Sequence, residues 1–223
     1  MIIANWKMNG SKEEVKNWID IFNDHVEYEN QSGCIFCPPS CFLDNANEII
    51  SSNNIQLNLG SQDLDPDADN PSTGGISGKM LKDLGCDYVL IGHSERRMYF
   101  NEHEDVLLQK LTSAALNNLK IVYCVGETKE QREQGMAIEA IKIQLRALKG
   151  LPVNLISVAY EPIWSIGKGI TPSLDSIHEM HQIIKDELKS ILSTEENIAV
   201  SYGGSVSAEN AVSISLLNSV DGL

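Results

Sequence analysis

Side chains able to move protons stand directly after four apolar runs of this sequence. Asn5 and Lys7 follow "IIA", His93 follows "YVLI" after one glycine, Glu161 follows "ISVAY", and Ser205 ends the turn "YGGS". Each alone has an ordinary explanation, such as a solvated strand end, a helix cap, a surface acid or a tight turn. Because an acid, an imidazole, a cation and backbone donors recur at the ends of four runs, we interpret them as one catalytic set.

This set fits proton transfer next to a carbonyl group. Glu161 would remove the proton, while Asn5, Lys7 and His93 would stabilise the developing enolate oxygen. His93 stands just before "SERR", where a helix is expected to begin. The N-terminus of a helix disfavours a positively charged imidazolium, so we expect a neutral imidazole.

The overall charge indicates how an anion would be bound. The chain has a formal net charge of −14 and an isoelectric point near 4.7, which disfavour a nucleic-acid or anionic-membrane surface. An anionic ligand would therefore have to be bound by a local group of hydrogen-bond donors or positive charges. The glycine-rich turns "SIGKG" and "YGGS" supply backbone N–H donors suited to phosphate.

The elements that must position these residues alternate along the chain. Short apolar runs alternate with longer amphipathic stretches, which predicts repeated βα units around a parallel sheet. The expected strands are Ile2–Trp6, Cys34–Cys37, Ile55–Leu59, Tyr88–Ile91, Ile121–Val125, Leu155–Tyr160 and Ile198–Tyr202, with Ser219–Leu223 opening an eighth. The expected helices are Lys12–Tyr28, Phe42–Ser52, Ser77–Leu84, Glu104–Asn117, Lys129–Lys149, Ser173–Leu192 and Ala208–Leu216, with caps at Ser11, Ser40, Ser173 and Ser207.

Eight βα units predict an α/β protein of the (β/α)8 barrel type. A doubly wound sheet would more often carry a GxGxxG turn after its first strand, and "NWKMNGS" stands there instead. In barrels, active sites lie at the C-terminal ends of the strands, which is where the catalytic set is found. With no linker or break in composition, we expect residues 1–223 to form a single domain.

Five segments in barrel order carry a resemblance to a known family. "NWKMNG", "GHSERR", "CVGE", "YEPIWSIGKG" and "SYGGSV" resemble triosephosphate isomerases, and the resemblance covers nearly the whole chain. It implies a TIM barrel and the interconversion of dihydroxyacetone phosphate and glyceraldehyde 3-phosphate, through an enediol(ate), in glycolysis and gluconeogenesis. It implies no metal and no organic cofactor.

The resemblance also assigns roles to residues. His93 matches the family's electrophile and Glu161 its catalytic base, "PIWSIGKG" matches its lid, and Cys124 and Glu127 are expected to be structural supports. The positions that match the family's substrate and phosphate contacts are Asn5, Lys7, Gly167 and Ser205.

Two departures from the family pattern lead to further expectations. The family's eighth strand continues from "VDG" into a Gly-Gly turn and a last helix, whereas this sequence ends at Leu223. We therefore expect a stub of strand 8, no last helix, and an open edge between strands 7 and 1. The segment "PDADNPSTGGIS" resembles the loop that docks into a partner subunit through Thr73, which predicts a homodimer. Gly75 replaces an acidic residue there, which removes an expected contact with Arg96.

The cysteines and the N-terminus bear on the cellular compartment. Cys34, Cys37 and Cys41 have metal-like spacings, but no partner pair of Cys or His recurs downstream at zinc spacing, so we expect reduced thiols and no metal site. No apolar stretch approaches the roughly 20 residues that span a bilayer, and the N-terminus does not resemble a signal peptide. We expect a cytoplasmic, unprocessed protein.

Two alternatives stay open from the sequence. Another barrel enzyme acting on a sugar phosphate would use Lys7 as a Schiff-base amine, which borohydride trapping with substrate would reveal. A barrel-derived binding or interaction protein, catalytically weak or inactive, would also fit an incomplete eighth strand. Isomerase turnover separates that protein from an enzyme.

Overall fold

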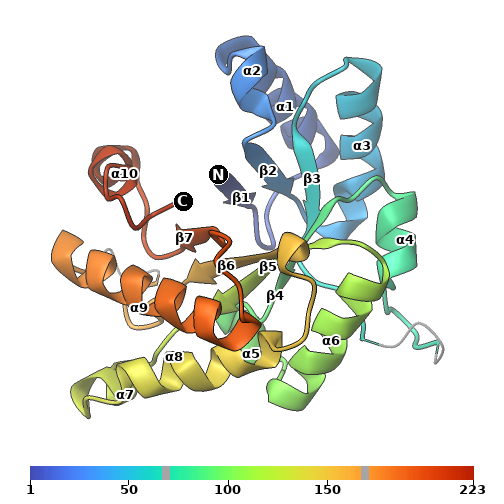
Figure 1. Ribbon diagram of the computed structural model, residues 1–223. Coiled ribbons are helices and arrows are strands. Elements are labelled where there is room, and N and C mark those ends of the chain that lie inside the picture. Colours follow the sequence, from blue (N-terminus) through green and yellow to red (C-terminus); the bar gives the residue numbers. More distant parts are fainter. Residues whose placement is uncertain (67–70, 167–170) are drawn as a thin grey trace.

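A single parallel sheet organises the chain. The computed structural model describes residues 1–66, 71–166 and 171–223. Seven parallel strands lie side by side in chain order, each hydrogen-bonded to the next, with helices around them (Figure 1). The strands are β1 (Ile2–Asn5), β2 (Cys34–Cys37), β3 (Asn58–Ser61), β4 (Tyr88–Ile91), β5 (Lys120–Val125), β6 (Ile156–Tyr160) and β7 (Val200–Tyr202). The architecture is that of a (β/α)8 barrel whose eighth strand is a stub.

The helices cover the outside of the sheet. The α-helices are α1 (Lys12–His25), α2 (Tyr28–Gln31), α3 (Leu43–Ser52), α4 (Gly78–Asp83), α5 (Ser94–Tyr99), α6 (Glu104–Leu116), α7 (Lys129–Glu133), α8 (Ala137–Leu145), α9 (Leu174–Leu192) and α10 (Ala208–Ser215). Short 3-10 helices span Ser40–Phe42, Arg146–Leu148 and Val153–Leu155.

The last residues of the chain join the two edge strands. The Leu223 N–H donates to the Met1 carbonyl at 3.0 Å, and the Ile3 N–H donates to the Leu223 carbonyl at 2.8 Å. On the other side, the Tyr202 N–H donates to the Gly222 carbonyl at 2.9 Å. The segment is the expected stub of an eighth strand, but it pairs on both sides. The expectation of an open edge between β7 and β1 is therefore wrong along this stretch.

Three predicted elements differ from the structure by a break or by three residues at one end, and most others by one or two residues. The helix predicted over Lys129–Lys149 is split into α7 and α8 at Gly135, whose φ of +73° lies in the left-handed region that favours glycine. β3 begins later than predicted, because the Ile55 N–H donates to the Ile50 carbonyl and so belongs to the turn that ends α3. The helix predicted from Lys12 ends at His25.

The predicted caps are correct at three of four positions. Ser11 and Ser173 each accept a hydrogen bond from a backbone N–H three residues later, and Ser207 forms a capping box with Asn210. Ser40 opens a 3-10 helix instead, and α3 has Phe42 at its N-cap without a side-chain hydrogen bond.

Two apolar layers surround the sheet. Most buried apolar residues lie between the strands and the helices, and a smaller cluster lies on the inner face of the sheet. The inner cluster comprises Ile35, Cys37, Leu90, Val122, Cys124 and Ala159. All five cysteines are free. Four residues of the inner cluster also line a cavity of about 650 Å³ that reaches into the ring: Leu90, Val122, Cys124 and Ala159.

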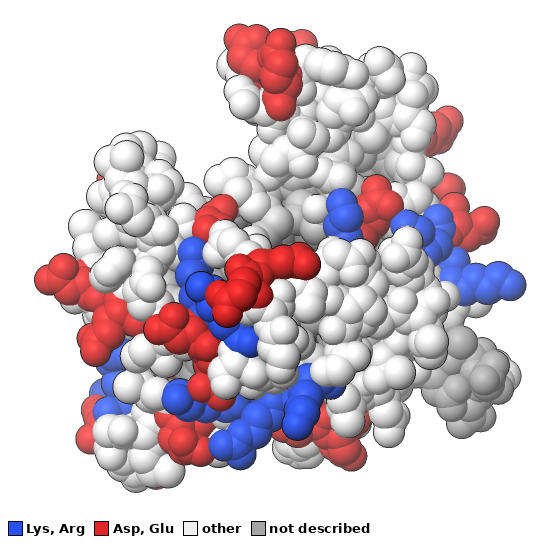
Figure 2. Space-filling model, viewed as in Figure 1, with Lys and Arg blue, Asp and Glu red and all other residues white. Residues whose placement is uncertain are grey.

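The surface mixes charges of both signs. On the face seen in Figure 2, Lys and Arg side chains lie among Asp and Glu and do not form one broad basic area. Among the described residues, no helix is long and apolar enough to cross a membrane.

A buried histidine holds the C-terminal segment against α9. His181 is fully buried, and its Nδ1–H donates to the Ser219 carbonyl at 3.3 Å. Within the described residues, its Nε2 has no hydrogen-bond partner. Burial, aided by the charge of Lys185, lowers the pKa of His181 to about 4 from its ordinary 6.5. The folded protein therefore needs this ring to be neutral.

Acid should destabilise the fold through His181. Because its pKa is lower in the folded than in the unfolded state, the contribution is complete above about pH 6.5 and is lost as the pH falls towards 4. We expect urea unfolding to show about 3 kcal/mol more loss between pH 7 and pH 4 for the wild-type chain than for His181→Gln. Equal losses in both proteins would contradict this assignment.

Candidate active site

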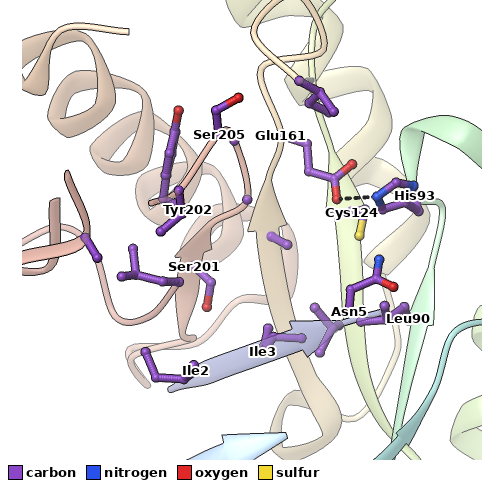
Figure 3. A pocket seen from close by; sticks show the side chains of 18 of the residues that line it. Ile2, Ile3, Asn5, Leu90, His93, Cys124, Glu161, Ser201, Tyr202 and Ser205 are labelled. Carbon is purple, nitrogen blue, oxygen red and sulfur yellow. Dashed lines mark ion pairs between the residues drawn. The ribbon is translucent and has the colours of Figure 1, made fainter. Parts of the chain in front are cut away.

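Five of the sequence-predicted site residues line one cavity. The cavity has a volume of about 650 Å³, and Asn5, Lys7, His93, Glu161 and Ser205 are among its lining residues. They come from the C-terminal ends of β1, β4, β6 and β7 or from the turns that follow. The parallel pairing places all these ends on one side of the sheet, so residues far apart in sequence meet there (Figure 3).

The residues predicted to contact phosphate are described only in part. Gly167, predicted to contact phosphate, lies outside the described residues, as does the rest of the segment 167–170 of the predicted lid. Ser205 is described, and its hydroxyl donates to the Ser165 carbonyl at 2.9 Å. The turn after β7 thus contacts the segment that follows Glu161.

His93 and Glu161 face each other at the centre of the site. His93 Nε2 lies 3.4 Å from Glu161 Oε1, the pair joined by a dashed line in Figure 3. His93 is also the N-cap of α5, where its Nδ1 accepts the Glu95 N–H at 3.2 Å. A backbone N–H can only donate, so in the neutral ring Nδ1 carries the lone pair and Nε2 carries the hydrogen. The Nε2 hydrogen therefore lies on the side of the ring that faces the Glu161 carboxylate.

The Glu161 carboxylate is anchored at the start of α5. Its side chain is only 7% exposed, and Oε2 accepts the Ser94 N–H at 3.2 Å. Sequence reasoning missed Ser94 because its contact is made by the backbone. Its position directly after His93 in "GHSERR" was the available signal.

Lys7 is held in a strained backbone conformation. Its φ is +52°, a region that non-glycine residues enter at a cost of roughly 1–3 kcal/mol. Two side chains fix it there: Asn5 Oδ1 accepts the Lys7 N–H, and Gln62 Nε2 donates to the Lys7 carbonyl, both at 2.9 Å. The ammonium Nζ lies 2.6 Å from Glu95 Oε1. These contacts aim a positive charge at the cavity.

Glu127 anchors the start of the segment that follows Glu161. It is fully buried, and its Oε1 accepts hydrogen bonds from Trp164 Nε1 at 2.8 Å, from the Tyr160 hydroxyl at 3.1 Å and from Arg132 at 3.1 Å. Burial, followed by the charge of Glu127, raises the pKa of Tyr160. Glu127 therefore fixes the chain on both sides of Glu161.

Gly126 forms the wall behind Glu161. A Cβ atom at position 126 would stand 1.8 Å from the Glu161 carbonyl oxygen, so no larger residue fits unless a strand moves. Cys124 lies beside it, facing the inside of the ring. Burial, followed by the charge of Glu161, raises the pKa of the Cys124 thiol well above its ordinary value, which favours an inert thiol.

The chain was compared with known proteins. A family model described as "Triosephosphate isomerase" matches residues 1–223. The chain belongs to the triosephosphate isomerase family. This confirms the resemblance read from the five sequence segments. Among the described residues, no cluster of three or more His, Cys, Asp or Glu could hold a metal ion.

Curated relatives named "Triosephosphate isomerase" match over the whole chain. The protein of Lawsonia intracellularis is 38% identical over 229 residues, covering 100% of this chain and 90% of the relative. That of Alkaliphilus oremlandii is 36% identical over 228 residues, covering 100% and 91%. That of Aquifex aeolicus is 34% identical over 227 residues, covering 100% and 91%.

Replacing Gly126 should displace the strand that carries Glu161. We expect Gly126→Ala to lower the free energy of unfolding by about 3 kcal/mol, because the new methyl group overlaps the Glu161 carbonyl. Gly150→Ala is the control, since its Cβ meets nothing within 4 Å and its φ of +85° should cost only about 1 kcal/mol. If thermal or urea unfolding gave equal losses of unfolding free energy for the two variants, Gly126 would not be in close contact with Glu161.

Proposed function

We propose that this chain interconverts dihydroxyacetone phosphate and glyceraldehyde 3-phosphate, as a triosephosphate isomerase of glycolysis and gluconeogenesis. One observation carries the proposal. In a chain of this family, the Glu161 carboxylate and the His93 ring face each other at one cavity that Lys7 also lines. A base, a hydrogen-bond donor and a cation are the groups needed to form and protect an enediolate.

The proton path follows from this placement. Glu161 takes a proton from the carbon next to the carbonyl and becomes a carboxylic acid. The electron pair of the C–H bond forms the C=C bond of the enediolate, and the π pair of the carbonyl moves onto its oxygen. The Nε2–H of His93 and the ammonium of Lys7 stabilise that oxygen. A hydroxyl proton passes between the two oxygens, and Glu161 returns its proton to the neighbouring carbon. A glutamate base and a neutral histidine are the established pair in this family.

The phosphate group needs a local set of donors. Gly203, Gly204 and Ser205 line the same cavity as Glu161, and we assign their turn to the phosphate together with Lys7. Gly167 is proposed to add a backbone N–H from the other side, as its match to the family pattern suggests. These groups would bind an anion despite the net charge of −14.

Lys7 is poorly suited to the alternative Schiff-base route. A nucleophilic lysine is activated by desolvation or by a neighbouring cation. The Lys7 side chain is instead 38% exposed and paired with the Glu95 carboxylate. Its placement fits a fixed charge better than a nucleophile.

Shortening the base tests the function. Glu161→Asp moves the carboxylate by about one methylene, and a misplacement of about 1 Å can cost roughly 100-fold in rate. We expect kcat to fall about 100-fold in both directions while KM changes less than threefold. Glu133→Asp, at an exposed position on α7, is the control and should leave kcat unchanged. A folded wild-type chain without turnover would contradict the function, and an active Glu161→Asp would remove Glu161 as the base.

We further propose a homodimer, with the loop that contains Thr73 docking into a partner. A second cavity of about 560 Å³ opens beside the active site and is lined by Lys7, Met8, Tyr99 and Phe100 among others. Met8 is 95% exposed, and both aromatic side chains are mostly exposed. Large apolar side chains around a hollow are typical of a protein interface. We propose a second copy of the chain as the occupant, because Ser72, Thr73, Gly74 and Gly75 of the docking loop are small residues suited to entering a hollow.

A charge in this cavity should break the dimer. We expect Met8→Glu to sediment as a monomer at micromolar concentration, while the wild-type chain sediments as a dimer. Leu216→Glu, at a position 75% exposed just after α10, is the control and should stay dimeric. A wild-type monomer at every concentration, or a dimeric Met8→Glu, would contradict the proposed interface.

We also propose that the chain acts as a single domain in the cytoplasm. Five free cysteines, three of them buried, suit a reducing compartment. The unbroken strand order suits one cooperative unit. Cell fractionation checks the compartment, and a single unfolding transition checks the domain.

A further inference from the structure

β5 runs past the end of its neighbour β4. The pairing of β4 with β5 ends at Ile91 and Tyr123, whereas that of β5 with β6 continues to Val125. In a parallel ladder, successive residues face opposite neighbours. Val125 faces β6, because its carbonyl accepts the Glu161 N–H at 2.7 Å. The N–H and carbonyl of Gly126 therefore face the side that β4 has left.

The side chain of Gln144 takes the place of the missing strand. Its Oε1 accepts the Gly126 N–H and its Nε2 donates to the Gly126 carbonyl, both at 2.9 Å. One amide thus satisfies both backbone groups of one residue, as a neighbouring strand would. Gln144 lies near the end of α8, where its own carbonyl accepts the Tyr123 hydroxyl at 3.2 Å.

The position of Gly126 determines that of Glu161. The two backbones are in close contact, since a Cβ atom added to Gly126 would lie 1.8 Å from the Glu161 carbonyl oxygen. The ladder continues on both sides of this contact: Val125 accepts the Glu161 N–H, and Glu127 accepts the Ile163 N–H at 3.2 Å. A shift of Gly126 would therefore shift the backbone that carries the carboxylate.

We propose that Gln144 is a positioning residue for the catalytic base Glu161. The inference rests on the proposed isomerase function. Gln144 is not among the residues that line the active-site cavity and acts only through Gly126. Without its amide, two buried backbone groups lose their partners and the edge of β5 is free to move. The carboxylate then loses the alignment on which the rate of proton transfer depends.

Removing both hydrogen bonds tests the proposal. Gln144→Met keeps the length of the side chain and is expected to lower kcat by about 10- to 100-fold. KM should change less than twofold, because Asn5 and Lys7 are untouched. A fall of the same size in kcat/KM would show that the lost interaction acts in the transition state.

Gln31→Met is the matched control. Gln31 is buried, its Nε2 donates to the Val26 carbonyl at 3.1 Å, and its Oε1 accepts the Gln56 N–H at 3.0 Å. As at Gln144, one side-chain amide links two backbone groups. Gln31 lies just before β2 begins, so it is at the N-terminal end of the strands, away from the active site. We expect a similar loss of stability with kcat unchanged. A loss of kcat in Gln144→Met no larger than in Gln31→Met would overturn the proposal.

Gln144→Glu tests the donor and the acceptor separately. An ionised carboxylate still accepts the Gly126 N–H but repels the Gly126 carbonyl, whereas a protonated carboxyl can donate to it. The ratio of the variant's kcat to that of the wild type should therefore rise as the pH falls from 8 to 5.5. A ratio independent of pH would count against the donor role.

Hydrogen exchange gives a result that does not depend on turnover. The amides of Glu161 and Ile163 donate to the ladder beside Gly126. In Gln144→Met they should exchange at least tenfold faster than in the wild type, and in Gln31→Met at the wild-type rate. Unchanged exchange overturns the positioning role even if the wild-type chain is inert, whereas an inert wild type with faster exchange in the variant counts only against the isomerase function.

Discussion

The parallel hydrogen-bond ladder is the constraint on which the rest of the structure depends. It runs from β1 round to β7, and residues 221–223 carry it back to β1. Because every strand runs in the same direction, all C-terminal ends lie on one side, and residues from four distant segments meet there. The buried His181 and the pairing of Leu223 therefore matter to the site, and Leu223 itself lines the active-site cavity.

The site forms where the ladder ends unevenly. Strands of different lengths leave backbone groups without a strand partner, and side chains supply the missing hydrogen bonds. Gln144 does so at Gly126, Arg97 at the Cys124 carbonyl, and Gln62 at the Lys7 carbonyl. These hydrogen bonds hold the strand ends in place. The chemical groups at those ends are thus aligned by residues that never face the cavity.

Much of this arrangement could be read from the sequence, because chemistry-bearing residues directly follow apolar runs. Asn5, His93 and Glu161 were placed correctly at strand ends, since a strand's end is visible as the end of an apolar run. Gln144 could not be found, because its role depends on β4 ending before β5, a property of two strands together. The pairing of Leu223 with β1 was missed for the same reason: it joins residues more than 200 positions apart.

Charge balance explains how an acidic chain can present a positive charge to its ligand. Glu95 pairs with Lys7 at 2.6 Å, and both side chains are partly exposed, so solvent screens the pair and its strength is modest. The left-handed backbone of Lys7, fixed by Asn5 and Gln62, sets the direction in which the side chain leaves the backbone. In the proposed function, the substrate phosphate competes with the single Glu95 carboxylate for this cation. The strained backbone of Lys7 therefore fixes where its side chain begins, and the ion pair with Glu95 places the ammonium.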